Sequence, residues 1–299
     1  DNIGIVHINP SLEFNGFFRD ALFLFIAKAI LGKKVVVFWR GWSKEFELQV
    51  EEKYMWFMRK TYLKASSSIV LAKEFEQKLR QWGYAKPIYQ ETTVLDEFLI
   101  DGLTNEKITE KYAATGTQLL FLARLERNKG IFEILEVYQK LKTEYPELSL
   151  MVAGDGGAMA ETKSVVAENK IADVTLLGFV RSKQKRQALL SSHVYLFPSW
   201  HGEGLPNSLL EAMGCGMPVL TTANAGIKDF FEHEKMGLIL DDCSSEELLS
   251  KLQSLLADRN RQLKMALYGH EYAKELFAAS KVVKRLEAIY CDVSKLQES

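Results

Sequence analysis

The stretch PSWHGEGLPNSLLEAMGCGMP, residues 198–218, decides the fold. It follows the apolar run VYLF at 194–197 and leads into PVLTT at 218–222, which predicts strand, loop, helix and strand in succession. Pro206 suits the first helical position, because its missing N–H costs nothing there. Strands joined through a helix lie parallel in one sheet, and such sheets bind ligands at the carboxyl ends of their strands. We therefore expect an α/β protein with a ligand site at this loop.

The same alternation of short apolar runs and helical patterns extends over residues 118–257. Strands are predicted at 118–123, 148–153, 174–177, 194–197, 218–222 and 237–240. Helices are predicted at 130–145, 159–169, 183–191, 207–215 and 245–257, followed by a helical tail at 260–295. This set of strands makes a complete doubly wound domain.

The first third of the chain has the same rhythm in a thinner form. Strands are predicted at 3–8, 34–38, 68–72 and 87–90, and helices at 19–31, 48–65 and 74–82. From 91 to 116 the apolar period fades, which indicates a domain boundary. We expect one domain at 1–105, a second at 106–275 and a carboxy-terminal helix at 276–299.

Composition excludes several classes of protein. A length of 299 residues allows two domains, and a net charge of −1 gives no footprint for nucleic acid. The odd count of 3 cysteines indicates a reducing cytosol. The longest apolar run, 21–27, is too short to span a bilayer. Residues 17–31 could lie against a membrane, but a core helix is the favoured interpretation. Four phenylalanines are then core or helix-face residues, namely Phe17, Phe18, Phe23 and Phe25.

The loop at 198–218 offers a site for a sugar nucleotide. The amides of Asn207 and Ser208 lie at the positive end of the predicted helix, where a phosphate binds well. Glu203 and Glu211 would then accept hydrogen bonds from hydroxyl groups on either side of the phosphate. A helix with two solvated glutamates would have the same spacing. A second loop favours the sugar-nucleotide site, because Arg124 and Lys129 also follow a strand and suit a diphosphate.

These segments resemble the donor domain of the family 4 retaining glycosyltransferases, which have two Rossmann-like lobes in the GT-B architecture. The matching pieces are Arg124 with Lys129-Gly130, VAGDG at 152–156, LGFV at 177–180, and Glu203 to Glu211 with Pro218-Val219. The resemblance implies two Rossmann-like domains facing a cleft, with the carboxy-terminal helix crossing back to the first.

The resemblance also implies the chemistry. Arg124 and Lys129 would hold the donor diphosphate, Glu203 the transferred sugar and Glu211 the ribose hydroxyls. The other donor-binding residues would be Gly178, Phe179, Val180, Gly204, Leu205, Pro206, Asn207 and Ser208. The implied reaction is a retaining transfer from a nucleotide-diphospho-sugar to an acceptor hydroxyl, with no metal and no cofactor. The acceptor would be a carbohydrate or a lipid-linked sugar, and the place the cytoplasm, with peripheral contact to the inner membrane face.

Two departures from the family pattern affect the first domain. The glycine-rich loop and the opening strands are absent, so we expect an incomplete first domain, and donor binding with little transfer by this chain alone. Many members carry a histidine where this chain has Trp39-Arg40-Gly41. Arg40 could take over an electrostatic role there or simply pack.

Parts of the sequence are also compatible with other functions. A non-catalytic nucleotide-sugar-binding subunit and a GT-B-like epimerase or phosphorylase stay open as alternatives. A dinucleotide fingerprint would need glycine at Met159, and His233 and His270 each lack the second histidine of a zinc helix. No Asp-x-Asp occurs, which argues against the metal-dependent transferases with a single Rossmann domain.

Overall fold

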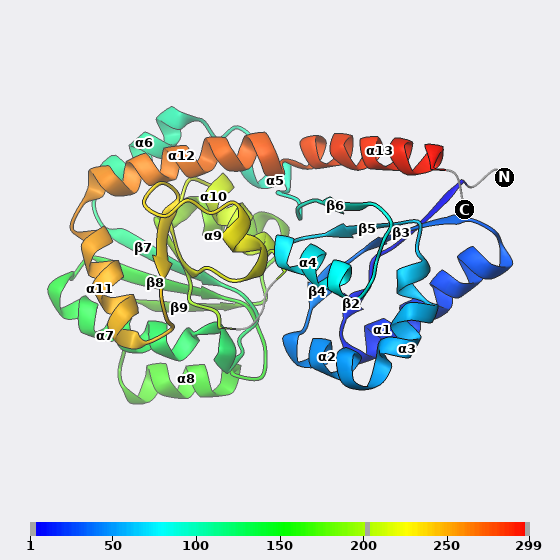
Figure 1. Cartoon of the computed structure of the whole chain (residues 1–299). Coiled ribbons are helices and arrows are strands. Elements are labelled where there is room, and N and C mark those ends of the chain that lie inside the picture. Colours follow the sequence, from blue (N-terminus) through cyan, green and yellow to red (C-terminus); the bar gives the residue numbers. More distant parts are fainter. Residues whose placement is uncertain (1–3, 201–203, 297–299) are drawn as a thin grey trace.

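The computed structural model describes residues 4–200 and 204–296. Their strands form two parallel sheets that lie side by side, with helices on their faces, and a long pair of helices runs along both (Figure 1). Each sheet belongs to one half of the chain, as the alternation of strands and helices predicts.

The first sheet has the strand order β1-β3-β5-β6, with every pair parallel. Its strands are β1 (Ile5–Ile8), β3 (Lys34–Phe38), β5 (Ser67–Val70) and β6 (Ile88–Gln90). Two short strands, β2 (Ser11–Leu12) and β4 (Gly41–Trp42), pair beyond its carboxyl edge. The helices are α1 (Phe14–Phe25), α2 (Lys44–Gln49), α3 (Met55–Lys60) and α4 (Lys73–Gln81), with π-helical turns η1 (Ile26–Ile30) and η2 (Val50–Tyr54) and the 3₁₀ turn η3 (Tyr62–Lys64).

The second sheet has the order β12-β11-β10-β7-β8-β9 and is also parallel throughout. Its strands are β7 (Thr117–Leu122), β8 (Leu148–Ala153), β9 (Val174–Gly178), β10 (Val194–Phe197), β11 (Val219–Thr222) and β12 (Gly237–Leu240). Its helices and turns are η4 (Arg127–Lys129), α7 (Ile131–Glu144), α8 (Met159–Glu168), α9 (Ser182–Ser191), α10 (Asn207–Gly214), η5 (Ala225–Asp229), α11 (Ser245–Leu256) and α12 (Arg259–Phe277). The order reverses between β7 and β10, so their carboxyl ends form the switch point where such sheets bind ligands.

The central strands are buried on both faces, which explains why they are continuous apolar runs. Leu119, Leu120 and Phe121 of β7 are fully buried, as are Val35, Val36 and Val37 of β3. One hydrophobic cluster is continuous from the first sheet into the second, and it includes Leu71 and Leu205. The two halves therefore share an apolar contact beside the carboxyl ends of their strands.

Two crossings of the chain connect the halves. Leu95, which follows the first sheet, pairs with Ala278, which separates α12 from α13 (Ala279–Lys295). The amide of Leu95 donates to Phe277 O at 2.7 Å, and the amide of Ala279 donates to Leu95 O at 3.2 Å. Beyond this point α13 lies along the first sheet, where Tyr290 Oη is 2.5 Å from His7 Nδ1. Figure 1 shows α12 and α13 as the pair that spans both halves.

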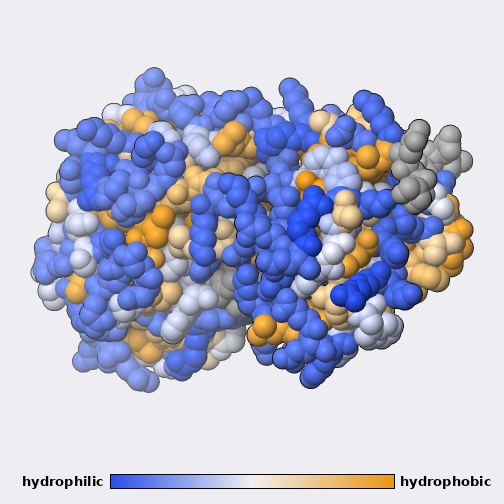
Figure 2. Space-filling view, in the orientation of Figure 1, coloured by the Kyte–Doolittle hydropathy of each residue, from blue (hydrophilic) through white to orange (hydrophobic). Residues whose placement is uncertain are grey.

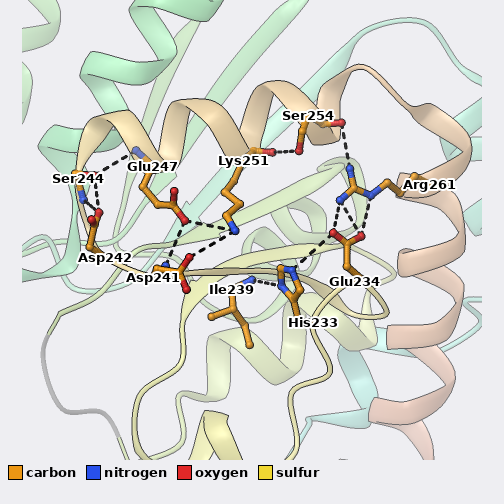
Figure 3. A network of polar contacts seen from close by, with 10 residues as sticks. All are labelled: His233, Glu234, Ile239, Asp241, Asp242, Ser244, Glu247, Lys251, Ser254 and Arg261. Carbon is orange, nitrogen blue, oxygen red and sulfur yellow. Dashed lines mark hydrogen bonds and ion pairs between the residues drawn. The ribbon is translucent and has the colours of Figure 1, made fainter.

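A polar network fixes α11 and α12 on the second sheet (Figure 3). Ser244 caps α11 by accepting a hydrogen bond from the amide of Glu247 at 3.2 Å. Arg261 donates to Glu234 from two nitrogens, Nε to Oε2 at 3.1 Å and Nη2 to Oε1 at 2.6 Å. Two parallel bonds of this kind hold the start of α12 in one orientation.

The structure corrects several sequence expectations. The helix expected at 19–31 begins at Phe14, and η1 continues it. The featureless region from 91 to 116 contains α5 (Glu97–Ile100) and α6 (Asn105–Ala113), where Ile108 and Tyr112 are buried against α12. The helical tail is interrupted at Ala278, because its backbone pairs with Leu95.

The helix at 14–30 packs on the core as expected, but only through one face. Phe17 is buried, but Phe23 and Phe25 are 54% and 52% exposed. Among the described residues, no helix combines the length and the apolar character needed to cross a membrane.

Candidate functional site

A cleft of about 620 Å³ opens at the carboxyl ends of both sheets. The second half contributes the loops after β7, β8 and β9, helix α9 and the start of α10, and the first half contributes the loop after β3 and the segment after β6. The lining residues are Arg40, Thr93, Leu122, Ala123, Arg124, Ala153, Gly154, Asp155, Phe179, Val180, Lys185, Leu205, Asn207 and Ser208. The cleft therefore includes the switch point of the second sheet.

Glycines allow the loops of the cleft floor to touch. Gly154 has φ +144°, and a Cβ there would lie 1.8 Å from Ala123 O. Its amide donates to Gly178 O at 2.8 Å, which ties the loop after β8 to the end of β9. Gly130 has φ +79°, and a Cβ there would lie 2.6 Å from Pro198 O. Only glycine fits at either position, because a side chain would push adjacent loops apart.

Two cations lie together in the loop after β7. Arg124 lines the cleft, its side chain is 73% exposed, and its guanidinium is 3.2 Å from a Glu126 carboxylate oxygen. Lys129 is buried behind it at the end of η4. Burial, and next the charge of Arg124, lower the pKa of Lys129 to about 8, against an opposing effect of Glu126. A bound anion would stabilise both positive charges, so the pair suits a phosphate group.

The start of α10 faces the same space. Asn207 and Ser208 line the cleft, and their amides precede the helical hydrogen-bond ladder. Tyr195 Oη lies 2.8 Å from Ser208 Oγ and fixes that side chain. Pro206 was expected to be the first residue of the helix. With φ −72° and ψ 124° it is instead the residue just before the helix, which begins at Asn207. The positive helix end and Arg124 thus border one cleft, and Lys129 is buried beside Arg124.

The residues just before α10 join the two halves. A Cβ on Gly204 would lie 2.9 Å from Leu71 Cδ1 and 3.4 Å from Arg40 O. Thr93 Oγ1 donates to Leu205 O at 3.3 Å. Glu203, which the sequence assigned to the transferred sugar, lies outside the described residues.

Glu211 and Lys185 form an ion pair, of which the sequence analysis identified only Glu211. Lys185 Nζ, from α9, lies 2.6 Å from each Glu211 carboxylate oxygen. Burial raises the pKa of Glu211, and the charge of Lys185 opposes that rise. Glu211 Oε2 is buried and touches Lys185, but it accepts no hydrogen bond of good geometry from a described residue. Lys185 lines the cleft and Glu211 lies behind it.

Sequence reasoning missed Lys185 because it took only Gly178, Phe179 and Val180 from the segment after the strand predicted at 174–177. A signal was available, because Lys185 lies in the first turn of the helix predicted at 183–191, just as Asn207 begins the helix predicted at 207–215. Phe179 and Val180, which belong to the loop after β9, do line the cleft. Phe179 is 68% exposed, so its ring is available to stack on a ligand.

Arg40 reaches the cleft from the first half. Its guanidinium lies over the Phe38 ring, 4.6 Å from the centroid, and burial lowers its pKa. Among residues 4–200 and 204–296, no acidic side chain pairs with it. It therefore packs on an aromatic ring and also adds a positive charge opposite Arg124. Within the same two ranges, no group of three histidine, cysteine or acidic side chains is arranged for a metal ion.

Fold and cleft together define a two-lobed α/β protein with a cleft between its sheets that is lined by Arg40, Arg124 and Lys185. The chain belongs to the family described as glycosyl transferases group 1, whose sequence pattern matches residues 104–272.

Curated relatives match only part of the chain. It is 26% identical over 174 residues to the phosphatidylinositol N-acetylglucosaminyltransferase gpi3 subunit of Schizosaccharomyces pombe, covering 58% of this chain and 37% of that protein. It is 28% identical over 148 residues to the putative colanic acid biosynthesis glycosyltransferase WcaL of Escherichia coli, covering 48% of this chain and 36% of that protein. The matched region is thus little more than a third of each relative.

Solved structures show the same architecture. The structure of Anabaena Alr3699/HepE with UDP and glucose gives a TM-score of 0.77 at 16% identity, over 97% of this chain and 78% of that one. Sucrose-phosphate synthase from Thermosynechococcus elongatus gives a TM-score of 0.74 at 18% identity, over 97% of this chain and 73% of that one. At such identities the likeness concerns the fold, and it confirms the expected GT-B architecture.

Proposed function

We propose that this protein transfers a sugar from a nucleotide-diphospho-sugar to an acceptor hydroxyl, with retention at the anomeric carbon and without a metal ion, as a family 4 enzyme. The observation that supports this most directly is the cleft between the two lobes. It presents Arg124 and the amino end of α10 to one space, and Lys129 is buried beside Arg124. Two cations and a helix end suit a diphosphate better than they suit any neutral ligand.

In the proposed reaction, the bond from the anomeric carbon to the diphosphate oxygen breaks and the acceptor oxygen bonds to that carbon. The acceptor proton leaves to the departing diphosphate or to water. Negative charge grows on the diphosphate as the bond breaks, so Arg124, Lys129 and the α10 amides stabilise the transition state. Arg40 adds positive charge from the opposite lobe.

The remaining roles are distributed around the diphosphate. Glu211 accepts hydrogen bonds from ribose hydroxyls, and Lys185 orients it and opposes the rise in its pKa that burial causes. Gly178, Phe179 and Val180 flank the base, and Glu203 contacts the transferred sugar, an assignment that rests on the sequence. Residues 106–275 form the donor-binding domain, 1–105 the acceptor side and 276–299 the connecting helix.

We further propose a cytoplasmic reaction on a carbohydrate or lipid-linked acceptor. The described cysteines, Cys215, Cys243 and Cys291, are all free thiols, which suits a reducing compartment. The E. coli relative is named for colanic acid biosynthesis and the Anabaena structure contains UDP. A UDP-sugar is therefore the first donor to test.

The test has two stages. A thermal-shift screen against UDP-, GDP- and ADP-linked sugars should find one base that raises the melting temperature, because a ligand stabilises the form that binds it. Transfer of radiolabelled sugar from that donor to carbohydrate and lipid extracts should follow. Binding without transfer, or isomerisation of the donor without transfer, would contradict the proposed reaction and favour a binding subunit or an epimerase respectively.

A further inference from the structure

Helix α4 of the first lobe has no cap from its own segment of the chain. The residue before it is Ala72, whose side chain cannot accept a hydrogen bond, and the amide of Lys73 has no acceptor within the helix. The acceptor comes from the other lobe, because Asp229 Oδ2 accepts a hydrogen bond from the Lys73 amide at 2.7 Å. A carboxylate at this place also stabilises the positive end of the helix dipole. Asp229 is therefore a helix cap that crosses from one lobe to the other.

The same carboxylate oxygen holds a second group of the first lobe. Gln90, the last residue of β6, donates from Nε2 to Asp229 Oδ2 at 2.8 Å. Lys73 follows the carboxyl end of β5, which is the neighbour of β6 in the first sheet. One oxygen atom of the second lobe thus links two adjacent strand ends of the first. We call these two hydrogen bonds the Asp229 contact.

The segment that carries Asp229, η5, is itself fixed to the loop before α10. The amide of Gly226 donates to Gly204 O at 2.9 Å, and Asn224 Nδ2 donates to Ser199 O at 2.9 Å. A Cβ on Gly226 would lie 2.5 Å from Gly204 O and 2.5 Å from Leu71 O, and Leu71 directly precedes the cap of α4. The start of α4 and the loop that leads into α10 are thus held by the same short segment.

The Asp229 contact is polar and lies at the surface. Figure 1 shows α4 at the border between the two halves, and Figure 2 shows mainly hydrophilic side chains over that border. Lys73 and Gln90 are both exposed residues. Because water can replace either partner, such bonds break and re-form more readily than a buried apolar contact does. The contact can therefore be made in one orientation of the lobes and released in another.

We propose that Asp229 is a positioning residue that holds the two lobes in the orientation with a narrow cleft. With the contact made, the start of α4 lies against η5, and Arg40 and Arg124 line one cleft from opposite lobes. Without it, the first lobe is free to turn away. A cap of this kind changes an equilibrium constant about fivefold, so it favours the narrow cleft without locking it. The effect on transfer rests on the proposed function, whereas the effect on the lobes does not.

Two substitutions of Asp229 separate its hydrogen bonds from its charge. Both bonds end on one oxygen, so Asp229→Asn keeps an acceptor for them and Asp229→Ala removes it. Gln90→Ala removes one of the two bonds, and its smaller effect should not add to that of Asp229→Ala. Asp258→Ala is the matched control, because Asp258 caps α12 within the second lobe by accepting from the Arg261 amide at 2.9 Å.

The distance between two spin labels follows the lobes directly. Cys291 is exposed on α13, which lies along the first sheet, and a second cysteine can replace Lys140, which is exposed on α7 of the second lobe. Cys243→Ser removes a further accessible thiol, and Cys215 is buried. The parent protein, Asp229→Asn and Asp258→Ala should give one narrow distribution of distances. Asp229→Ala should give a broader distribution with a second distance.

Hydrogen exchange and kinetics complete the test. In Asp229→Ala the amides at the start of α4 should exchange about fivefold faster, and kcat for transfer should fall about fivefold with unchanged nucleotide affinity. Asp229→Asn should restore both values. The affinity is expected to stay constant because the proposed donor-binding residues belong to the second lobe.

Three results would overturn the proposal. The first is a distance distribution of Asp229→Ala that equals that of the parent protein. The second is equal broadening by Asp258→Ala, which would show that loss of any cap loosens the chain. The third is a fall in nucleotide affinity as large as the fall in kcat, which would place Asp229 in donor binding. Absence of transfer by the parent protein would contradict the proposed function, and the distance measurement would still decide the role of Asp229.

Discussion

Raising the pH from about 7 to about 9 should weaken the binding of a nucleotide-diphospho-sugar about tenfold, through Lys129. Its ammonium is buried beside Arg124, and its pKa is about 8 rather than the ordinary 10.5. A diphosphate bound against it would favour the charged form and move the pKa back toward 10.5. The free protein must then take up a proton before it can bind tightly at high pH.

The size of the effect follows from the fraction of Lys129 that is protonated in the free protein. With a pKa of about 8, that fraction is about 0.9 at pH 7 and about 0.1 at pH 9. The sign is fixed as well: affinity is fully present below the free-state pKa and is lost as the pH rises through it. In the free protein the same group has the opposite effect on stability, because the cost of burying the ammonium is present at low pH and is relieved between about pH 8 and 10.5.

Isothermal titration calorimetry with a sugar nucleotide measures both the affinity and the number of protons taken up on binding. Its phosphates are diesters that do not titrate in this range, unlike the terminal phosphate of a free nucleotide. At pH 8 in two buffers of different ionisation enthalpy, binding should take up about half a proton. Lys129→Arg keeps a permanent charge, so its affinity should be nearly independent of pH, and Lys129→Met should bind weakly at every pH. A wild-type affinity that stays constant from pH 6.5 to pH 9, with no proton uptake, would refute the reasoning.

Three further predictions concern single side chains. Glu211→Ala should weaken nucleotide binding by about 1–3 kcal/mol with the fold preserved, because ribose hydroxyls lose their acceptor; calorimetry that shows unchanged affinity would remove Glu211 from the site. Arg124→Ala should lower kcat on the order of 10²-fold, since charge grows on the leaving diphosphate; steady-state kinetics with normal kcat and only a raised KM would show that Arg124 merely binds. Gly154→Ala should lower the melting temperature strongly, because its Cβ would lie 1.8 Å from Ala123 O, whereas Gly157→Ala, with nothing within 4 Å, should not. Equal melting temperatures for these two variants would contradict the account of the cleft floor.

The regular part of the fold could be predicted from the sequence because its central strands are buried on both faces. The run at 34–38 corresponds to β3 and the run at 194–197 to β10, residue for residue. Such runs are continuous, so their limits coincide with the change from apolar to polar residues. Helix α6 was missed because only Ile108 and Tyr112 carry its buried side, which is too few apolar positions to establish a period.

Other features depend on tertiary contacts that a single sequence does not display. The break at Ala278 arises from pairing with Leu95, 183 positions earlier, and nothing in the local sequence marks it. The same holds for the Lys185–Glu211 pair, which joins two helices. At the site, the sequence indicated the loops correctly as strand-to-helix turns, and Arg124, Asn207 and Ser208 meet in one cleft. Their assigned roles in donor binding remain predictions.

The pairing of Leu95 with Ala278 limits how the two lobes can move. In the described residues, both passages of the chain between the sheets lie next to each other and are hydrogen-bonded, with Arg285 donating to Glu91 at 2.7 Å close by. Sliding one lobe past the other would break these bonds, whereas a swing about the line through Leu95 and Ala278 would keep them. In such a swing, displacement grows with distance from the axis. Thr93, two residues from it, would keep its contact with Leu205. Arg40 and Arg124 line the cleft from opposite lobes, so the separation of these two arginines would report the angle between the lobes.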